Sequence, residues 1–231
     1  MLRQYRILVV EDSPTAQSLL NTTLKKAGYQ VTIADNGTEA LIIHEENPPH
    51  LIILDLLLPG MDGFAFCKQV RQSSMVPILV ISGLSGNEHK LKAFEAGADD
   101  YMLKPCCPEE LLMRVQSLLR RSYWNGHQQS GKGIWRCGNV EVDFTNRCLR
   151  RNGEEVPLTR TEWALLDELV RNLGRVLTHE ELLQRVWGKT YGSETEYLRV
   201  YIGRLRRKLG DNPKKPRYLI TQPGVGYRLV E

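Results

Sequence analysis

The stretch Leu51-Ile-Ile-Leu-Asp-Leu-Leu-Leu-Pro-Gly60 decides the fold of the first half of the chain. Its opening run of four apolar residues is typical of a short strand that is buried on both faces of a parallel sheet. Similar runs occur at 7–10 and 78–81, and weaker candidates lie at 31–34 and 101–103. Together these segments predict the strands of one parallel sheet.

Segments with helical spacing of apolar residues separate these runs. Leu19, Leu20 and Leu24 precede Gly28, and apolar residues recur with the same periodicity between 111 and 119. We therefore expect five strand–helix units in a doubly wound α/β domain. In such sheets the working site lies beyond the carboxyl ends of the strands, so the residues that follow each strand are the candidates for function.

The composition bounds the class of protein. The 231 residues are 42% hydrophobic and 25% charged, which is ordinary for a globular protein and excludes disorder as the main state. No apolar run approaches the roughly 18 residues of a bilayer helix, and the apolar run before Glu11 is too short for a signal peptide, so we expect a soluble cytoplasmic protein without membrane contact. The five cysteines form no C-x-x-C motif and favour neither a disulfide framework nor a zinc site.

Charge divides the chain into two parts. Residues 1–121 hold 12 Lys and Arg against 14 Asp and Glu, whereas residues 122–231 hold 19 against 13. Between them, 122–132 is rich in Gly, Ser, Gln and Asn without apolar periodicity, which predicts a flexible linker. We expect one domain at 1–121, a linker at 122–132 and a second, basic domain at 133–231.

Polar side chains lie at the predicted strand ends. Glu11 and Asp12 follow the first strand, Asp55 ends the third, Ser82 ends the fourth and Lys104 follows the fifth. Three converging carboxylates repel one another unless a cation lies among them, and oxygen ligands favour Mg²⁺. Carboxylates are nucleophiles toward phosphoryl groups, and Mg²⁺, Lys104 and Ser82 would take up the charge of the phosphoryl oxygens. The pattern predicts an acyl phosphate at Asp55.

Other interpretations fit the spacing less well. Any one of these five residues could simply be a solubilising loop residue. That explanation does not fit all five of them at matching strand ends. The loop after the first strand has no glycine, which excludes a G-x-G-x-x-G dinucleotide site. Leu57 stands two residues after Asp55, where a phosphatase would need a general-acid Asp. A lasting phosphoryl mark is therefore expected, and not an enzyme with efficient turnover.

The first half resembles the receiver domain of two-component response regulators over residues 4–121. The matching segments are Val10-Glu-Asp12, residues 51–63, Val80-Ile-Ser82 and residues 97–105. The resemblance implies that Asp55 accepts phosphate from a histidine kinase. It also implies that Glu11, Asp12 and the carbonyl of Leu57 help hold Mg²⁺.

The same resemblance implies a switch near the phosphoryl group. Ser82 and Lys104 would contact that group, and Tyr101 would turn inward as Ser82 moves toward the phosphate. The peptide bond before Pro105 is often cis in the family.

The second half has the pattern of a small antiparallel sheet between 134 and 158, followed by helices at 161–171, 178–187 and about 194–209 and by a hairpin at 217–230. In the third helix Leu198, Ile202, Leu205 and Leu209 form an apolar seam. We expect its basic side chains to be largely free to face outward. They are Arg199, Arg204, Arg206, Arg207 and Lys208. This order of elements predicts a winged helix-turn-helix domain that places a basic helix in the DNA major groove.

Residues 134–231 resemble the DNA-binding domain of the OmpR/PhoB class, and more narrowly its regulators of potassium-transport genes. The broad match lies in Leu158-Thr-Arg-Thr-Glu162, residues 174–178, residues 205–209 and residues 224–228. It implies base contacts from positions expected to be exposed, namely Tyr197, Val200, Tyr201 and Arg204. Pro223 replaces the arginine frequent at the wing tip, so Lys214, Lys215 or Arg217 would supply backbone contacts.

The class also forms dimers through the receiver. The matching cross-subunit ion pairs would be Lys90 with Glu110, Asp99 with Arg121, and Asp100 with Arg114. Expected partners are a sensor histidine kinase, double-stranded promoter DNA, a second copy of the phosphorylated chain and, as a further candidate, RNA polymerase. Two alternatives stay open: a hydrolase with an appended protein-binding module, and a phosphate-independent DNA-binding protein with a receiver-like dimerisation scaffold.

Overall fold

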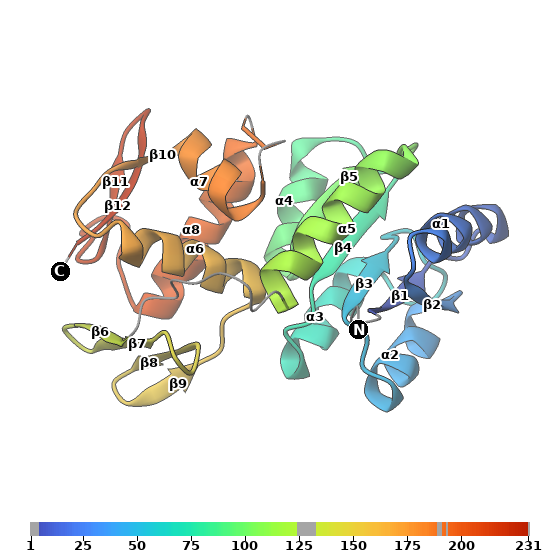
Figure 1. Cartoon of the computed structure of the whole chain (residues 1–231), viewed down its shortest axis with the longest axis horizontal. Helices are drawn as coiled ribbons and strands as arrows, with labels where there is room; N and C mark the ends of the chain where they lie inside the picture. The colour runs from blue at the N-terminus through green and yellow to red at the C-terminus, as the bar shows by residue number, and fades with distance from the viewer. Residues whose placement is uncertain (1–4, 124–132, 189–190, 193, 231) are drawn as a thin grey trace. The chain divides into compact units, whose positions relative to one another are not determined.

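The computed structural model describes residues 5–123, 133–188, 191–192 and 194–230 (Figure 1). The chain divides into two compact units, Met1–Ser122 and Tyr123–Glu231. Each unit has its own sheet and helices, and each is described by itself.

The N-terminal unit contains a five-stranded parallel sheet in the order β2-β1-β3-β4-β5. Its strands are β1 (Arg6–Val10), β2 (Gln30–Ala34), β3 (Leu51–Leu54), β4 (Ile78–Ser82) and β5 (Asp100–Leu103). The apolar side chains of β1, β3 and β4 are buried, because helices cover both faces of the sheet. All five predicted strands are confirmed.

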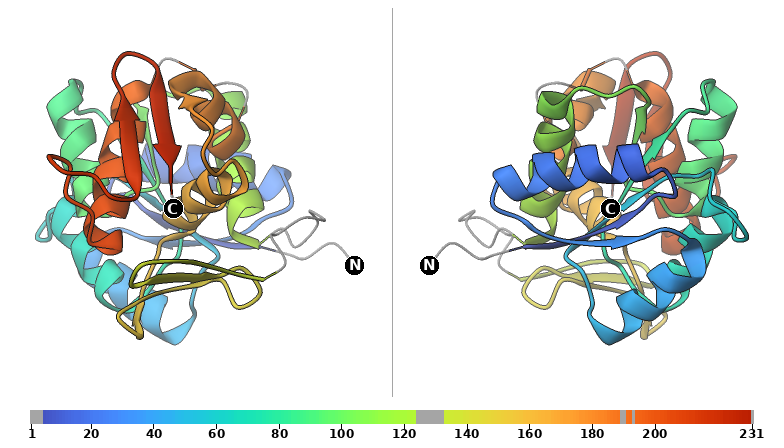
Figure 2. Two further views of the ribbon diagram at one scale, coloured as in Figure 1. Left: turned by 90° about the vertical axis from the view of Figure 1, so that its left-hand side faces the viewer. Right: turned by 90° about the vertical axis from the view of Figure 1, so that its right-hand side faces the viewer.

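Five helices connect these strands. They are α1 (Pro14–Lys26), α2 (Gly37–Glu46), α3 (Gly63–Ser73), α4 (Asn87–Ala96) and α5 (Pro108–Tyr123). The right-hand view of Figure 2 shows α1 and α2 on opposite sides of the sheet. Local capping sets two of the helix starts: Asn36 accepts a hydrogen bond from the Glu39 N–H, and Asp62 accepts one from the Phe64 N–H. The doubly wound fold is confirmed.

The C-terminal unit begins with a four-stranded antiparallel sheet, β6-β7-β8-β9. Its strands are β6 (Ile134–Cys137), β7 (Val140–Asp143), β8 (Cys148–Arg151) and β9 (Glu154–Val156). Asn152 and Gly153 join β8 to β9 with φ of 55° and 83°, the left-handed conformation that a two-residue hairpin turn requires. The turn predicted at Arg151-Asn-Gly153 is confirmed.

Three helices and a second sheet complete this unit. The elements are α6 (Arg160–Arg171), α7 (His179–Val186), α8 (Thr195–Leu209), β10 (Leu177–Thr178), β11 (Leu219–Gln222) and β12 (Gly226–Leu229), with strand order β10-β12-β11. Thr159 and Thr178 start α6 and α7 through reciprocal capping boxes with Glu162 and Glu181. The four residues of the predicted α8 seam are all buried. The winged helix-turn-helix prediction is confirmed.

The boundary between the units lies close to the predicted one. Helix α5 runs to Tyr123, so Ser122 and Tyr123 belong to a helix and not to the predicted linker. The rest of that segment, 124–132, lies outside the described residues, and the linker stays a prediction. Within the described part of the chain, no helix is long and apolar enough to cross a membrane.

Candidate functional site

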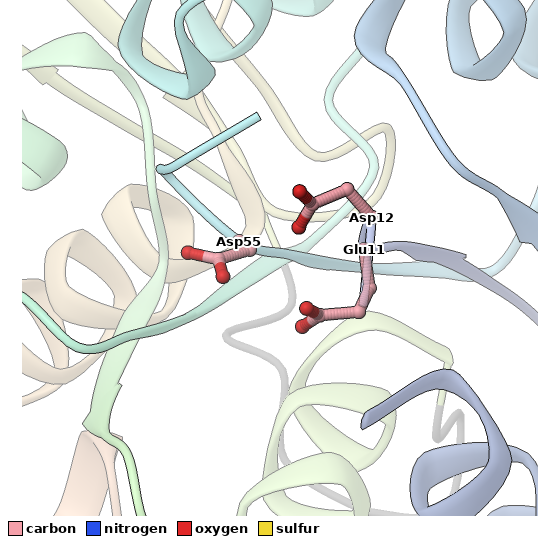
Figure 3. A group of neighbouring side chains, drawn as sticks. All are labelled: Glu11, Asp12 and Asp55. Carbon is pink, nitrogen blue, oxygen red and sulfur yellow. The ribbon is translucent and has the colours of Figure 1, made fainter. Parts of the chain in front are cut away.

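Three carboxylates meet at the carboxyl edge of the parallel sheet (Figure 3). Glu11 and Asp12 follow β1, and Asp55 follows the neighbouring strand β3. One oxygen from each of the three lies within 4.8 Å of the others. Glu11 and Asp55 are only 2% and 5% exposed, whereas Asp12 is open to solvent. The sequence predicted this convergence from the strand ends alone.

Lys104 supplies a positive charge to this cluster. Its Nζ lies 2.7 Å from Glu11 Oε2 and 2.5 Å from Asp55 Oδ2. Burial alone would lower the pKa of Lys104, but the hydrogen bonds and negative charges of Asp55 and Glu11 outweigh it and raise the pKa. The ammonium group therefore stays charged at neutral pH. The peptide bond between Lys104 and Pro105 is cis, as expected.

Backbone and hydroxyl groups hold the remaining predicted residues nearby. The Leu57 N–H donates to Asp55 Oδ1 over 3.0 Å, which orients the carboxylate. Ser82 is fully buried at the end of β4, and its hydroxyl accepts a hydrogen bond from the Leu84 N–H. The Tyr101 hydroxyl donates to the Leu84 carbonyl over 2.6 Å. Tyr101, in β5, thus already points inward and is hydrogen-bonded to the loop that follows Ser82.

The pKa of the Tyr101 hydroxyl depends on its burial and on the charge of the nearby acidic cluster. Burial raises the pKa of the Tyr101 hydroxyl, a hydrogen bond with Ser82 opposes that rise, and the charge of Asp55 adds to it. The two residues predicted to act as a switch are both hydrogen-bonded to the backbone of Leu84, Ser82 to its N–H and Tyr101 to its carbonyl. The movement attributed to them stays a prediction.

The donor set suits a hard divalent cation. Three carboxylates and one ammonium group leave a formal charge of about −2 at a partly exposed site. Carboxylate oxygens with access to water are the ligands that Mg²⁺ prefers. An Asp oxygen beside such an ion and a lysine can attack a phosphoryl group, and the positive charges can stabilise the oxygens that become more negative.

The second candidate site is α8, where the structure corrects part of the prediction. Lys208 Nζ lies 2.5 Å from Glu162 Oε2 and 2.7 Å from the Pro157 carbonyl. Arg204 Nη1 lies 3.7 Å from the other oxygen of Glu162. Glu162 is 1% exposed, so a buried carboxylate holds two side chains that were expected to be free. Sequence analysis missed this role, although Glu162 stands three residues after the cap Thr159 in a capping-box spacing.

The side chain of Arg206 is also hydrogen-bonded within the C-terminal unit. Its Nη2 donates to the Leu219 carbonyl over 2.8 Å and to Thr221 Oγ1 over 2.7 Å, so it joins α8 to the first strand of the wing. The expectation that Arg204, Arg206 and Lys208 are largely free was therefore wrong. Their partners lie far along the sequence, where helical periodicity carries no information.

Tyr197 and Tyr201 were expected to be exposed, and this was wrong as well. They are 6% and 0% exposed, and the Tyr201 ring packs edge-on against Trp187 at 5.2 Å between centroids. Tyr197 lies one turn before Tyr201 on the same side of α8, because residues four apart are neighbours on a helix. The buried side of α8 is therefore wider than the seam of four residues. The cations of α8 that remain exposed are Arg199 and Arg207.

Comparison with known proteins identifies both units. Residues 7–116 match the model of the response regulator receiver domain, and residues 153–229 match that of the C-terminal domain of transcriptional regulatory proteins. The chain is 39% identical over 222 residues to the transcriptional regulatory protein KdpE of Mycobacterium tuberculosis, covering 96% of this chain and 97% of the relative. The chain belongs to the OmpR/PhoB class of response regulators.

Other relatives of this response regulator bear different names. The sensory transduction protein RegX3 of Mycolicibacterium smegmatis is 38% identical over 223 residues, covering 96% of this chain and 98% of that one. Among solved structures, a mutant of RitR aligns with a TM-score of 0.77 at 29% identity, covering 97% of this chain and 98% of that one. DrrB, an OmpR/PhoB homologue of Thermotoga maritima, aligns with a TM-score of 0.52 at 30% identity, covering 99% and 100%.

The loop after α8 presents further cations of the response regulator. Lys214, Lys215 and Arg217 are all exposed. Both ends of this loop are fixed by Asp211, a buried residue whose carboxylate accepts hydrogen bonds from the Arg217 N–H over 2.6 Å and the Leu219 N–H over 2.8 Å. The residues predicted to contact the DNA backbone therefore lie on a loop whose two ends are held together by Asp211.

Four of the six predicted dimer residues of this regulator have ion-pair partners within one chain. Asp99 is 1% exposed and lies 2.7 Å from Arg71 Nη2, while Asp100 lies 2.9 Å from Arg114 Nη1. Arg114 also pairs with Glu110 at 2.7 Å. A cross-subunit pairing of these residues would exchange or share existing ion pairs. That pairing, including the contacts expected of Lys90 and Arg121, stays a prediction.

Proposed function

We propose that Asp55 accepts a phosphoryl group from a histidine kinase and that this modification controls how the C-terminal domain binds promoter DNA. The observation that carries the proposal is the convergence of Glu11, Asp12 and Asp55 around the ammonium group of Lys104. In this proposal Mg²⁺ is held by the three carboxylates and the carbonyl of Leu57. The ion would neutralise the charge that develops on the transferred phosphoryl oxygens.

The residues of the chain divide the chemistry between them. An oxygen of Asp55 attacks phosphorus, and the bond from phosphorus to the donor nitrogen of the kinase breaks. The ion pair of Lys104 with Asp55 is lost as that oxygen bonds to phosphorus and an acyl phosphate forms, so the ammonium group turns to the phosphoryl oxygens. The hydroxyl of Ser82 donates a hydrogen bond to the phosphoryl group. The movement of Ser82 toward that group alters the hydrogen bonds that join Ser82 and Tyr101 to Leu84.

The C-terminal domain is proposed to bind duplex DNA as a dimer. The exposed cations Arg199, Arg207, Lys214, Lys215 and Arg217 lie on α8 and on the loop that follows it. Phosphorylated receivers would pair, and two DNA-binding domains would then occupy half-sites as one bivalent unit. Contact with RNA polymerase belongs to the same proposal. Relatives of nearly equal identity carry different names, so regulation of potassium-transport genes stays a prediction.

The test is phosphorylation by a small acyl phosphate in the presence of Mg²⁺. We expect stoichiometric labelling of the wild-type chain, loss of labelling in Asp55→Asn, and loss of labelling when the metal is chelated. Asp35→Asn is the matched control, because Asp35 follows β2 at the same sheet edge but outside the acidic cluster. Labelling of Asp35→Asn should equal that of the wild type. Persistent labelling of Asp55→Asn would discard the assignment.

A further inference from the structure

Gly203 lies in the middle of α8, on the side opposite the apolar seam. Glu196, Val200, Gly203 and Arg207 repeat the 4-3-4 spacing of the seam residues but are offset from them by two positions. Two positions correspond to about 200° around an α-helix. Gly203 therefore occupies the centre of the outward line of α8, between Val200 and the exposed Arg207.

The fold gives no reason for a glycine at this position. Glycine is less favourable in a helix interior than every residue except proline. A Cβ added at Gly203 would meet no atom of the described chain within 4 Å, and its backbone is not in the left-handed region. The nearby glycines differ: Gly210 ends α8 with φ of 71°, and a Cβ on Gly226 would overlap the Leu177 carbonyl. Gly203 weakens the helix without relieving any contact within the protein.

The side chains around Gly203 leave this part of the helix surface bare. Arg204 and Arg206 follow it in the sequence, but Glu162 holds the first and the wing strand holds the second. One turn away along α8, Arg199 and Arg207 remain exposed. The result is a short stretch of half-exposed helix backbone with room for an added Cβ, with a cation one turn before it and another one turn after it. A polyanion bound by these two arginines would face the backbone at Gly203.

We propose that Gly203 is the point at which the α8 backbone approaches duplex DNA most closely, and that any side chain there would hold the helix away from the groove. This inference rests on the proposed DNA contact of α8 and names the residue that determines how deeply α8 enters the groove. Glycine is used where a ligand approaches the backbone closely, because a Cβ would occupy the space that the ligand needs. The loss of helix stability is then offset by tighter DNA binding.

The test compares folding and DNA binding in the full-length chain. The variants are Gly203→Ala and Gly203→Leu, and the probe is a duplex that the wild-type chain isolates from a random-sequence pool. Urea unfolding followed by tryptophan fluorescence reports the C-terminal domain, which contains Trp163 and Trp187. We expect both variants to unfold at higher urea than the wild type. We expect the Kd of Gly203→Ala to rise by roughly tenfold, the equivalent of one lost base contact, and that of Gly203→Leu to rise further.

Two controls separate a steric effect from other causes. Gly192→Ala makes the same chemical change just before α8, where an added Cβ meets nothing closer than 4.0 Å, and should leave the Kd unchanged. The slope of log Kd against log salt should be the same in Gly203→Ala and wild type, because no cation is removed.

The outcomes are distinguishable. If Gly203→Ala binds the duplex as tightly as the wild type, or if it unfolds at lower urea, the inference is overturned. If the wild-type chain retains no duplex at all, the proposed DNA contact itself is wrong. A loss of affinity together with increased stability supports the inference, because a purely structural role would move both quantities in the same direction.

Discussion

Replacing Lys104 by methionine is expected to destabilise the receiver domain without metal and to strengthen its binding of Mg²⁺. The ammonium group is 2.7 Å from Glu11 and 2.5 Å from Asp55. Both carboxylates are nearly fully buried, so the substitution leaves two like charges close together without their cation. Methionine keeps the length and most of the apolar contact of the lysine stem.

The magnitude follows from burial. Removing one partner of a buried ion pair costs about 3–5 kcal/mol. The Lys104 side chain is 30% exposed, and screening by water reduces the expected loss to about 1–3 kcal/mol. At about 3–6 °C per kcal/mol for a domain of this size, the transition should fall by roughly 3–18 °C. Without the competing ammonium group, Mg²⁺ should bind at least about tenfold more tightly, which returns about 1.4 kcal/mol of stability at saturation.

Differential scanning calorimetry of the full chain, in EDTA and in saturating Mg²⁺, measures both effects. The receiver transition is the one that shifts with metal. Lys68→Met is the matched control, since Lys68 is exposed on α3 in the same domain, and it should change either transition temperature very little. If Mg²⁺ raised the transition of wild type and Lys104→Met by the same amount, the idea that Lys104 competes with the metal would be refuted.

Three further predictions follow from contacts described above. Glu162→Gln should lower the free energy of unfolding of the C-terminal domain by about 1–3 kcal/mol in urea titrations, because Lys208 loses its buried partner; an unchanged midpoint would contradict this. Arg207→Ala should reduce the slope of log Kd for DNA against log salt by about one, whereas Lys208→Met should not. Burial lowers the pKa of His44, so the unfolded chain is protonated first as pH falls below about 6.5, and stability is lost there. Calorimetry of His44→Leu should show a receiver transition that changes less between about pH 7 and about pH 5 than in wild type.

The strands and the acidic cluster at the sheet edge were predictable because both depend on local signals. A run such as Leu51–Leu54 has no polar residue to place on a solvated face, so only a strand covered on both sides accommodates it. The residues after such strands converge at one edge in every sheet of this topology. Asp55 and Lys104 therefore meet although they are 49 positions apart.

The environment of the basic side chains on α8 was not predictable in the same way. Helical periodicity places Leu198 and Leu205 inside, but it does not state which charged residue meets a buried carboxylate. The contact between Lys208 and Glu162 spans 46 positions, and it depends on how two helices pack. Asp99 shows the same limit, because its partner Arg71 lies 28 positions away in α3.

The anchoring of the loop after α8 bears on how the protein can change its DNA targets. Asp211 fastens the start of β11 to the end of α8, and Asn212 accepts hydrogen bonds from the backbone N–H groups of Lys214 and Lys215, so the backbone holds this loop while the two lysine side chains are exposed. Lys214 and Lys215 can be exchanged, added to or removed while the wing keeps its register. If these lysines contact DNA as proposed, affinity for it can drift by single substitutions, independently of the receiver and of α8.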